Sequence, residues 1–314
     1  MSNSEFDLIE RAFRRGAPPV HAQTVVANGD DASVHRLADG MELVVSVDGS
    51  MAGVHWPHDF PLDLAADRAA CAALSDLAAM GAEPLWLWTT AMAVSSASAE
   101  AMGEGINAAL HRHGVELAGG DSVRSPVDGL SFTVAGQLPM GTAMRRDAAL
   151  AGDELWLIGR LGISARALTD WQRGMRDEQT QADFAAVIPQ LAAGQQLRQL
   201  GVRCCIDVSD GLMQDAGHIA QASGVALHIE LERLPGWQTM ARELGEEAAS
   251  RLMLAGGEDY ALLFAASSAL RGSLAPMAVC IGVCSDGSGV QVQHGGVAIS
   301  MGQGGYDHFA TLGD

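Results

Sequence analysis

Apolar and polar positions along this chain follow two periods, one typical of helices and one typical of strands. Residues 5–15 carry apolar side chains at helical spacing, and an alanine-rich stretch over 64–80 follows Asp63, which can cap a helix. A further helix is expected to begin at Ser98 and to end at Gly114. Short apolar runs predict strands over 41–47, 85–94, 115–118 and 130–138.

A second series of elements follows the turn Ala151-Gly152-Asp153. The strands expected there are 154–158, 204–208, 225–231 and 260–265, followed by a β-rich terminal segment. The helices expected there are 164–172, 182–200, 211–222 and 246–255. Because strands and helices mix without strict βαβ alternation, the sequence predicts an α+β protein. It would have two mixed α/β domains, over residues 1–148 and 149–314.

Composition and charge limit the partners of such a protein. With 314 residues, 48% of them hydrophobic, the chain can form two packed cores. Its formal net charge of −19 argues against binding to nucleic acid or to an anionic membrane. Phosphate substrates stay open, because divalent cations can lie between acidic side chains and a polyphosphate.

The expected location is the cytoplasm. The five cysteines include the adjacent Cys204-Cys205 in an apolar run and form no C-x-x-C pair, which favours buried thiols in a reducing compartment. No basic segment followed by an apolar one marks a signal peptide at the start. The apolar stretch 85–94 is far shorter than the ~20 residues that span a bilayer.

Lysine is absent: the combined count of 19 lysines and arginines consists of arginines alone. P-loop proteins and protein kinases place a lysine on the nucleotide phosphates, and Schiff-base chemistry needs a lysine amine. If this protein handles nucleotide phosphates, it does so with metal ions, arginine and backbone amides.

Aspartates recur in short clusters marked by glycine or serine. The clusters are Gly29-Asp30-Asp31, Ser46-Val47-Asp48, Ser75-Asp76, Gly119-Gly120-Asp121, Asp207-Val208-Ser209-Asp210-Gly211 and Gly256-Gly257-Glu258-Asp259. Each is expected to be a small turn that carries a carboxylate. Because Mg²⁺ prefers oxygen ligands, the clusters suggest that distant segments converge on a hard cation.

Each cluster also has a simpler explanation when taken alone. Asp31 fits an ordinary turn, Asp48 a solvated strand end, and Asp121 a plain tight turn. Asp76 lies in an apolar helix with little other charge, so it faces either solvent or a site. Asp210 is by itself best explained as a helix N-cap. A helix N-terminus with a serine and two carboxylates can, however, also take an anion and its metal.

Taken in order, these clusters resemble the thiamine-monophosphate kinase family. That family shares a superfamily with aminoimidazole ribonucleotide synthetase, selenophosphate synthetase and a hydrogenase-maturation protein. The resemblance covers nearly the whole chain, and its most specific parts are Ser75-Asp76-Leu77-Ala78-Ala79-Met80-Gly81 and Gly305-Tyr306-Asp307-His308-Phe309. It implies ATP-dependent phosphorylation of thiamine monophosphate to thiamine diphosphate. It also implies a homodimer whose N-terminal sheets pair, and a C-terminal α/β sandwich.

The same resemblance assigns roles to individual residues. The positions that match ligands of several Mg²⁺ ions are Asp31, Ser46, Val47, Asp48, Asp76, Asp121, Asp207 and Asp210, with Asp30 beside them. Those that match the ATP site are Gly120, Asp121, Arg146 and Ser209, and the choice between Arg145 and Arg146 stays open. Those on the thiamine side are His55, Glu258 and Tyr306. Asp76 and Asp210 are the expected catalytic residues.

One departure from the family concerns the metal positions. The family usually has threonine directly before the strand-end aspartate, where this chain has Val47, and often another in the next pair, here Gly49-Ser50. Val47 can offer a metal only its backbone carbonyl. The departure predicts weaker metal affinity and slower turnover more than a different reaction.

The proposed chemistry agrees with the residue types. The second pKa of a phosphate monoester is about 6, so the acceptor is already an anionic nucleophile at neutral pH and needs no general base. Two alternatives remain. One is a sister ATP-dependent ligase of the superfamily, against which the closing Gly305–Phe309 motif argues. The other is a non-catalytic nucleotide or thiamine phosphate binder, which its ligand would stabilise without product.

Overall fold

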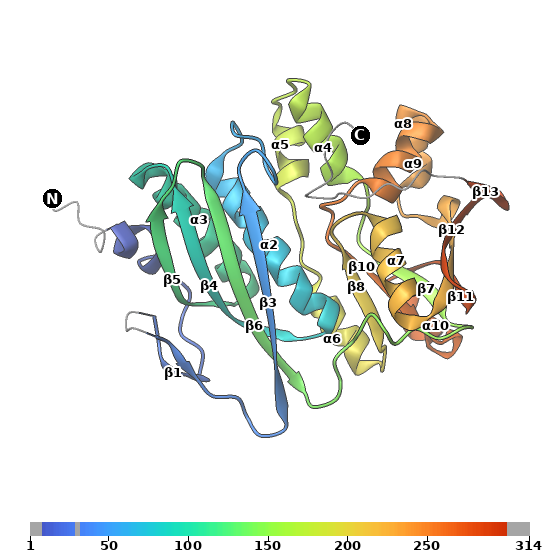
Figure 1. Cartoon of the computed structure of the whole chain (residues 1–314), viewed down its shortest axis with the longest axis horizontal. Coiled ribbons are helices and arrows are strands. Elements are labelled where there is room, and N and C mark those ends of the chain that lie inside the picture. Colours follow the sequence, from blue (N-terminus) through green and yellow to red (C-terminus); the bar gives the residue numbers. More distant parts are fainter. Residues whose placement is uncertain (1–7, 29–31, 300–314) are drawn as a thin grey trace. The chain divides into compact units, whose positions relative to one another are not determined.

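A computed structural model describes residues 8–28 and 32–299 of the chain. Its contacts divide the chain into two compact units (Figure 1). Unit 1 comprises Met1–Ala143 and Val187–Leu191, and unit 2 comprises Met144–Ala186 and Ala192–Asp314. Each unit combines a β-sheet with helices, so the chain has the mixed α/β character that its sequence predicts.

Unit 1 contains a mixed sheet of four strands within the described residues. Their order is β3 (Met41–Met51), β6 (Gly129–Pro139), β4 (Glu83–Ala93) and β5 (Glu116–Arg124). β4 and β5 are parallel, whereas the other neighbours are antiparallel. Helices α2 (Leu62–Met80) and α3 (Ser96–His113) cover one face of this sheet (Figure 1).

Small side chains allow α2 and α3 to pack closely. The buried side chains of α2 are mostly alanine, with Leu74 and Leu77 completing its apolar surface. At Gly105 of α3, an added Cβ would lie only 1.9 Å from the carbonyl oxygen of Asp63. Gly81 ends α2 with a φ of 74°, a conformation that glycine adopts without a steric penalty.

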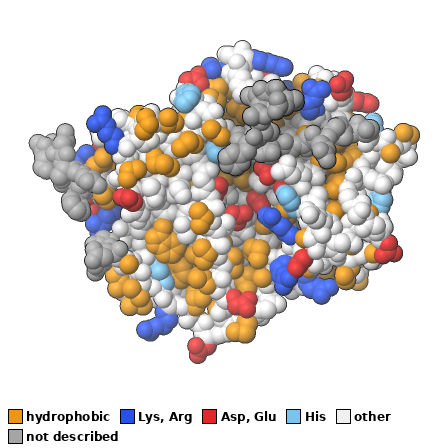
Figure 2. All heavy atoms as spheres, in the orientation of Figure 1, with side chains coloured by type: hydrophobic (Ala, Val, Ile, Leu, Met, Phe, Trp, Pro, Cys, Tyr) orange, Lys and Arg blue, Asp and Glu red, His pale blue; other side chains and the backbone are white. Residues whose placement is uncertain are grey.

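The other face of this sheet carries exposed apolar side chains along β3. Leu43, Val45 and Val47 are 54%, 52% and 68% exposed. Side chains alternate along a strand, so these three share one face while Ser46 and Asp48 point to the helices. Figure 2 shows hydrophobic side chains gathered over this sheet. Contiguous apolar surface of this kind is typical of an interaction site.

Short elements flank the sheet at the start of the chain. The expected helix over 5–15 is observed as the π-helix η1 (Glu10–Arg14), preceded by a short α-helical stretch, while residues 5–7 lie outside the described part. It is attached to α3, because the Asn107 side-chain amide donates to the Phe13 carbonyl oxygen at 3.2 Å. A small hairpin follows, formed by β1 (Thr24–Val26) and β2 (Val34–His35).

Unit 2 contains a sheet of seven strands within the described residues. Their order is β13 (Val297–Ile299), β12 (Gly289–His294), β9 (Val225–Glu230), β11 (Val279–Asp286), β7 (Glu154–Ile158), β10 (Ala261–Ala266) and β8 (Cys204–Val208). The helices are α4 (Ile163–Gln172), α5 (Glu178–Ala185), α6 (Leu191–Gln199), α7 (Leu212–Ser223), α8 (Trp237–Leu244), α9 (Glu246–Ala255) and α10 (Arg271–Leu274). Two short 3₁₀ turns are η2 (Leu231–Arg233) and η3 (Ser268–Leu270).

The core of unit 2 lies along its central strands. Every residue of β7, β8 and β10 is buried, and side chains such as Ile206, Leu227 and Leu263 form one apolar cluster. All five cysteines lie in the described part and are free thiols. Within residues 8–28 and 32–299, none of the helices combines the length and hydropathy that a membrane crossing requires.

Two strands run further than the sequence predicts. β3 does not end at Asp48, because its antiparallel pairing with β6 continues to Met51. β5 extends to Arg124, so Gly119-Gly120-Asp121 lies inside a strand and the expected tight turn is wrong. An added Cβ at Gly120 would lie 2.3 Å from the Thr89 carbonyl oxygen, so glycine is what lets the two strands approach here.

Several helix predictions are also corrected. The helix expected over 182–200 is two helices, α5 and α6, because Pro189 lies between them and cannot continue the first. The N-cap of α2 is Pro61, and Asp63 lies within its first turn. The N-cap of α7 is Gly211 instead of Asp210. Helix α8 was not expected.

We predict that Gly105→Ala destabilises the protein, although alanine favours a helix over glycine by about 1 kcal/mol. The methyl group would overlap the Asp63 carbonyl oxygen, and overpacking of this kind costs about 1–3 kcal/mol. Thermal unfolding followed by circular dichroism measures the change.

The control is Gly217→Ala in α7, where an added Cβ meets nothing within 4 Å. The same substitution should leave the melting temperature there unchanged or higher. A melting temperature for Gly105→Ala at or above that of the wild type would contradict the close packing of α2 against α3.

Candidate active site

In unit 1, two predicted metal ligands from distant parts of the sequence meet on the helix-covered face of the sheet. The Ser46 hydroxyl of β3 donates to Asp76 Oδ2 of α2 at 2.5 Å. Asp48 lies two residues along β3 on the same face, and its Oδ1 accepts the Gly49 amide at 2.7 Å. The structure therefore brings Ser46 and Asp76 into direct contact and places Asp48 next along the strand.

Val47 lies between these residues but faces the other way. Its side chain is on the exposed face of the sheet, beside Val45. A valine side chain has no atom that binds a metal, so Val47 can contact one only through its backbone carbonyl.

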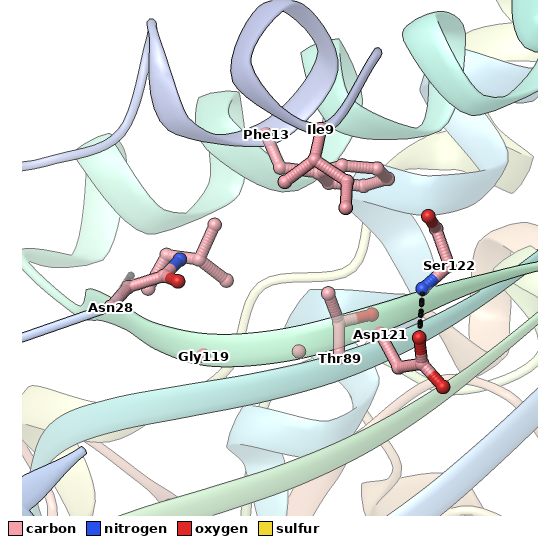
Figure 3. A pocket seen from close by; sticks show the side chains of 9 residues that line it. Ile9, Phe13, Asn28, Thr89, Gly119, Asp121 and Ser122 are labelled. Carbon is pink, nitrogen blue, oxygen red and sulfur yellow. Dashed lines mark hydrogen bonds between the residues drawn. The ribbon is translucent and has the colours of Figure 1, made fainter. Parts of the chain in front are cut away.

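The predicted nucleotide residues Gly120 and Asp121 line a pocket at the edge strand β5. The pocket is formed by Ile9, Phe13, Asn28, Thr89, Leu117, Gly119, Gly120, Asp121 and Ser122 (Figure 3). Ser122 lies on the side of Ile9 and Phe13, whereas the Asp121 carboxylate points to the other side of the strand and accepts the Ser122 amide at 2.8 Å. The pocket thus combines an apolar wall with polar groups of a glycine-rich strand.

The predicted metal ligands of unit 1 do not form one centre. β3 and β5 are opposite edges of the sheet, so Asp48 and Asp121 are separated by three strand spacings, roughly 14 Å. Asp121 is also on the opposite face, since it pairs with Thr90, whose antiparallel partner Ser131 lies opposite Gly49. One ion cannot bind both carboxylates within this unit.

His55 is held by the chain turn that follows β3. Its Nδ1 accepts the Met51 amide at 3.1 Å, and the ring is half-buried. Accepting that hydrogen bond leaves the other ring nitrogen, Nε2, to carry the proton of the neutral ring.

In unit 2, the predicted residues 207–211 form a loop between β8 and α7. Asp207 is 4% exposed at the end of β8. Oδ2 of Asp215, in the first turn of α7, accepts the amides of Ser209, Asp210 and Gly211 at 3.0, 3.1 and 3.2 Å. The Gln214 side chain donates to Asp210 at 3.0 Å. The loop is therefore fixed from α7 rather than capped by Asp210.

Negative charge accumulates at this loop. Burial, together with the carboxylates of Asp207 and Asp210, raises the pKa of Asp215 to about 7. Ligand atoms of Asp210, Asp215 and His218 lie within 4.8 Å of one another. Carboxylate oxygens are the ligands that Mg²⁺ prefers, so the carboxylates of Asp207 and Asp210 beside this loop fit Mg²⁺.

The predicted substrate residue Glu258 lies on a strained turn against the same loop. Glu258 and Tyr260 have φ values of 70° and 53°, which are uncommon for residues with a Cβ. The Glu258 amide donates to the Ser209 carbonyl oxygen at 2.7 Å, and the Tyr260 amide to that of Val208 at 2.8 Å. The Tyr260 hydroxyl donates to Glu258 Oε2 at 3.2 Å. Residues predicted to face ATP and thiamine are thus joined through the backbone.

The two neighbouring arginines differ in their partners. Arg145 forms an ion pair with Asp147, with Nε 2.9 Å from Oδ1. The Arg146 side chain is exposed and has no hydrogen-bond partner among the described residues. Its backbone carbonyl accepts the Ser223 hydroxyl at 2.8 Å, which fixes the main chain there. Arg146 is accordingly the arginine of this pair that is available to a phosphate.

Three of the predicted site residues lie outside the described part of the chain. They are Asp30, Asp31 and Tyr306. Their roles stay predictions, as does the Gly305–Phe309 motif that contains Tyr306.

A polar network that sequence reasoning missed anchors the hairpin on either side of residues 29–31. The Thr24 hydroxyl donates to Glu116 Oε2 at 2.7 Å and accepts the Trp86 indole N–H at 2.9 Å. His35 Nδ1 lies 3.1 Å from the same hydroxyl, and its ring centroid lies 4.2 Å from that of Trp86. Desolvation lowers the pKa of His35, partly opposed by the Glu116 carboxylate.

Two of the residues that were missed left a signal in the sequence. Glu116 is the lone acid of the apolar run 115–118, where a buried carboxylate needs partners. Asp215 is the single acid of α7 and lies in its first turn, where a negative charge favours the helix N-terminus. Neither signal identifies the partner, which depends on how the chain folds back.

Family models cover most of the chain. A model described as AIR synthase related protein, N-terminal domain, matches residues 29–138. A second, described as AIR synthase related protein, C-terminal domain, matches residues 151–280.

Curated relatives and solved structures agree with these matches. The thiamine-monophosphate kinase of Salmonella typhimurium is 35% identical over 99% of this chain and 100% of its own length. That of Caulobacter vibrioides is 34% identical over 83% of this chain and 76% of its own length. The crystal structure of thiamine-monophosphate kinase from Stenotrophomonas maltophilia has a TM-score of 0.81 and 34% identity, covering 89% of this chain and 93% of that one. AaThiL complexed with AMPPCP and TMP has a TM-score of 0.75 over 97% of this chain and 96% of that one, and at 23% identity it shows the fold alone.

We predict that His35 makes stability depend on pH. Its pKa in the folded chain lies below the ordinary 6.5, so protonation favours the unfolded state. The contribution of neutral His35 to stability is therefore fully present above a pH of 6.5, its ordinary pKa. It is lost as the pH falls from there through the lower pKa of the folded chain. The difference in melting temperature between wild type and His35→Gln should shrink from about pH 7.5 to about pH 5.5. A constant or widening difference would contradict a neutral, anchored His35.

Proposed function

This chain belongs to the thiamine-monophosphate kinase family, and we infer that it transfers the terminal phosphoryl group of ATP to thiamine monophosphate, giving thiamine diphosphate. The observation that carries this function is the 35% identity to a thiamine-monophosphate kinase over 99% of the chain. The transfer is direct, from donor phosphate to acceptor phosphate, and no covalent enzyme intermediate is needed.

The main task of such a site is to bring two polyanions together. The acceptor phosphate is already a nucleophile at neutral pH, since its second pKa is about 6. Catalysis then consists mostly of positioning the phosphates and offsetting their charge. A chain without lysine does this with metal ions, arginine and backbone amides.

Mg²⁺ is the cation that the residue types favour. In unit 1, Ser46, Asp48 and Asp76 would hold it, and in unit 2, Asp207 and Asp210 would do so. When bound, Mg²⁺ supplies positive charge to the phosphate oxygens and holds them in place. The raised pKa of Asp215 supports this, because burial and the charges of Asp207 and Asp210 cause it, and a cation would offset those charges. Asp31, Val47 and Asp121 complete the proposed ligand set.

ATP is proposed to contact Gly120, Asp121, Ser209 and Arg146. The pocket beside Gly120 supports this, because it offers an apolar wall and exposed main-chain groups. Arg146 is suited to the phosphates because its guanidinium has no partner among the described residues, whereas Arg145 pairs with Asp147.

Thiamine monophosphate is proposed to lie against His55, Glu258 and Tyr306. Of these, Glu258 has the best-defined position, because its amide and its carboxylate are both hydrogen-bonded. Asp76 and Asp210 are the proposed catalytic residues, acting through the cations that they hold.

The working unit is proposed to be a cytoplasmic homodimer in which the sheets of two N-terminal domains meet. Residues 1–148 would form the nucleotide-binding and dimerisation domain and residues 149–314 the C-terminal α/β domain. The exposed Leu43, Val45 and Val47 support the pairing, since monomers rarely leave such a strip in water. Five free thiols support a reducing compartment.

We predict that Asp76→Asn and Asp207→Asn each abolish turnover while leaving the fold intact. Each substitution removes a charge that would hold Mg²⁺. Asparagine has nearly the same size and shape as aspartate, so the packing around the side chain is preserved. Product formation is measured with ATP, Mg²⁺ and thiamine monophosphate, and folding by circular dichroism. The control is Asp39→Asn, an exposed aspartate of the turn before β3. Normal turnover in both variants would overturn the metal assignment.

The wild-type protein in the same assay separates the alternative functions. A kinase forms thiamine diphosphate only when Mg²⁺ is present. A sister ligase would leave thiamine monophosphate unchanged, and a non-catalytic binder would show a ligand-dependent rise in melting temperature without product.

We predict that Val45→Asp weakens the dimer. A charge buried without a partner at the interface is strongly unfavourable, by about 3–5 kcal/mol. Light scattering after gel filtration measures the mass. Val297→Asp is the control, because Val297 is 70% exposed on β13 of unit 2. Dimers of unchanged affinity for Val45→Asp would place the interface elsewhere.

A further inference from the structure

Asp215 stands out among the buried polar residues because it is bonded to predicted site residues without being one of them. It is 2% exposed and lies in the first turn of α7. One of its oxygens accepts three consecutive amides, those of Ser209, Asp210 and Gly211. The reaction described above gives it no task.

Three amides that converge on one oxygen determine the course of the loop. An amide points to a fixed acceptor only if the φ and ψ angles around it are fixed too. The directions in which the Ser209 and Asp210 side chains leave the backbone are therefore set by Asp215. These two side chains are the proposed ATP contact and the proposed metal ligand.

The same loop is held from its other side by the turn that carries Glu258. The Ser209 carbonyl oxygen accepts the Glu258 amide at 2.7 Å. There is no room for a side chain at Gly257, where an added Cβ would lie 2.3 Å from that carbonyl oxygen. Asp215, the 209–211 loop and the Glu258 turn thus form one hydrogen-bonded assembly.

We propose that Asp215 is a positioning residue for phosphoryl transfer, which sets the orientation of Ser209 and Asp210 through their backbone amides. The proposal rests on the proposed kinase function. Asp215 acts as an acceptor of hydrogen bonds, so an uncharged residue of the same shape that still offers an oxygen retains most of its role. Misplacing reacting groups by about 1 Å can slow a reaction by about 10²-fold.

The test compares Asp215→Ala with Asp215→Asn. Asp215→Ala should lower kcat by about 10²-fold and raise the Mg²⁺ concentration needed for half-maximal rate. Asp215→Asn keeps an acceptor oxygen and should recover most of the lost rate. The control is Asp177→Ala, which removes an aspartate that accepts the Thr180 amide at 2.9 Å and caps α5. It should lower the melting temperature by about 2–4 °C without changing kcat.

Hydrogen exchange supplies a readout that does not depend on activity. The amides of Ser209, Asp210 and Gly211 should exchange faster in Asp215→Ala than in wild type, and at an intermediate rate in Asp215→Asn. If Asp215→Ala does not fold, the rate and the exchange of Asp215→Asn decide alone. Loss of the amide protection in that variant with an unchanged rate would overturn the proposal.

Other outcomes overturn the proposal in distinguishable ways. A kcat for Asp215→Ala equal to that of Asp177→Ala means that the residue is only structural. A rate and Mg²⁺ dependence in Asp215→Asn as poor as in Asp215→Ala, with amide protection retained, means that Asp215 is itself a metal ligand. Absence of product from the wild type refutes the kinase function instead, and unchanged exchange in Asp215→Ala then refutes the positioning role separately.

Discussion

Carboxylates that share a buried site repel one another, and the energy of that repulsion must be offset by donors or cations. This constraint governs the loop after β8, where burial and the neighbouring carboxylates of Asp207 and Asp210 raise the pKa of Asp215 to about 7. Backbone amides from Ser209 to Gly211 offset part of that charge. The chain offers no lysine for the remainder. A divalent cation with its phosphate is the partner that such an arrangement accepts best.

Backbone groups can hold a charged loop only where another segment of the chain comes close to it, and small residues allow this close approach. Gly257 allows the turn of Glu258 to reach the Ser209 carbonyl oxygen, and Gly120 allows β5 to pair with β4 beside the pocket. At Gly120 and Gly257, glycine therefore acts in close packing. The chain continues as a strand at Asp121, so the glycine beside it does not mark a turn.

Local sequence patterns predicted the elements whose ends are set by residues next to them in the sequence. The strands 154–158 and 204–208 and the helix 246–255 are found with the expected bounds, because turns and caps limit them. The lengths of β3 and β5 were not predictable, since they depend on partners far along the chain. For the site, a convergence of aspartates was expected, and Ser46 does meet Asp76 across thirty positions. The hydrogen-bond partners of Asp215 depend on the backbone conformation of the 209–211 loop, which neither composition nor spacing predicts.

Side chains of β3 alternate between the two faces of the sheet, so the proposed ligands fall into two groups, one on each face. Ser46 and Asp48 face α2 and Asp76, whereas Val47 faces outward, as does Asp121 on β5. A side chain at position 47, whether valine or threonine, points away from Asp76 in the same unit. In this chain that position instead extends the apolar strip of Leu43 and Val45. The departure from the family therefore concerns the outer face and leaves the contact between Ser46 and Asp76 unchanged.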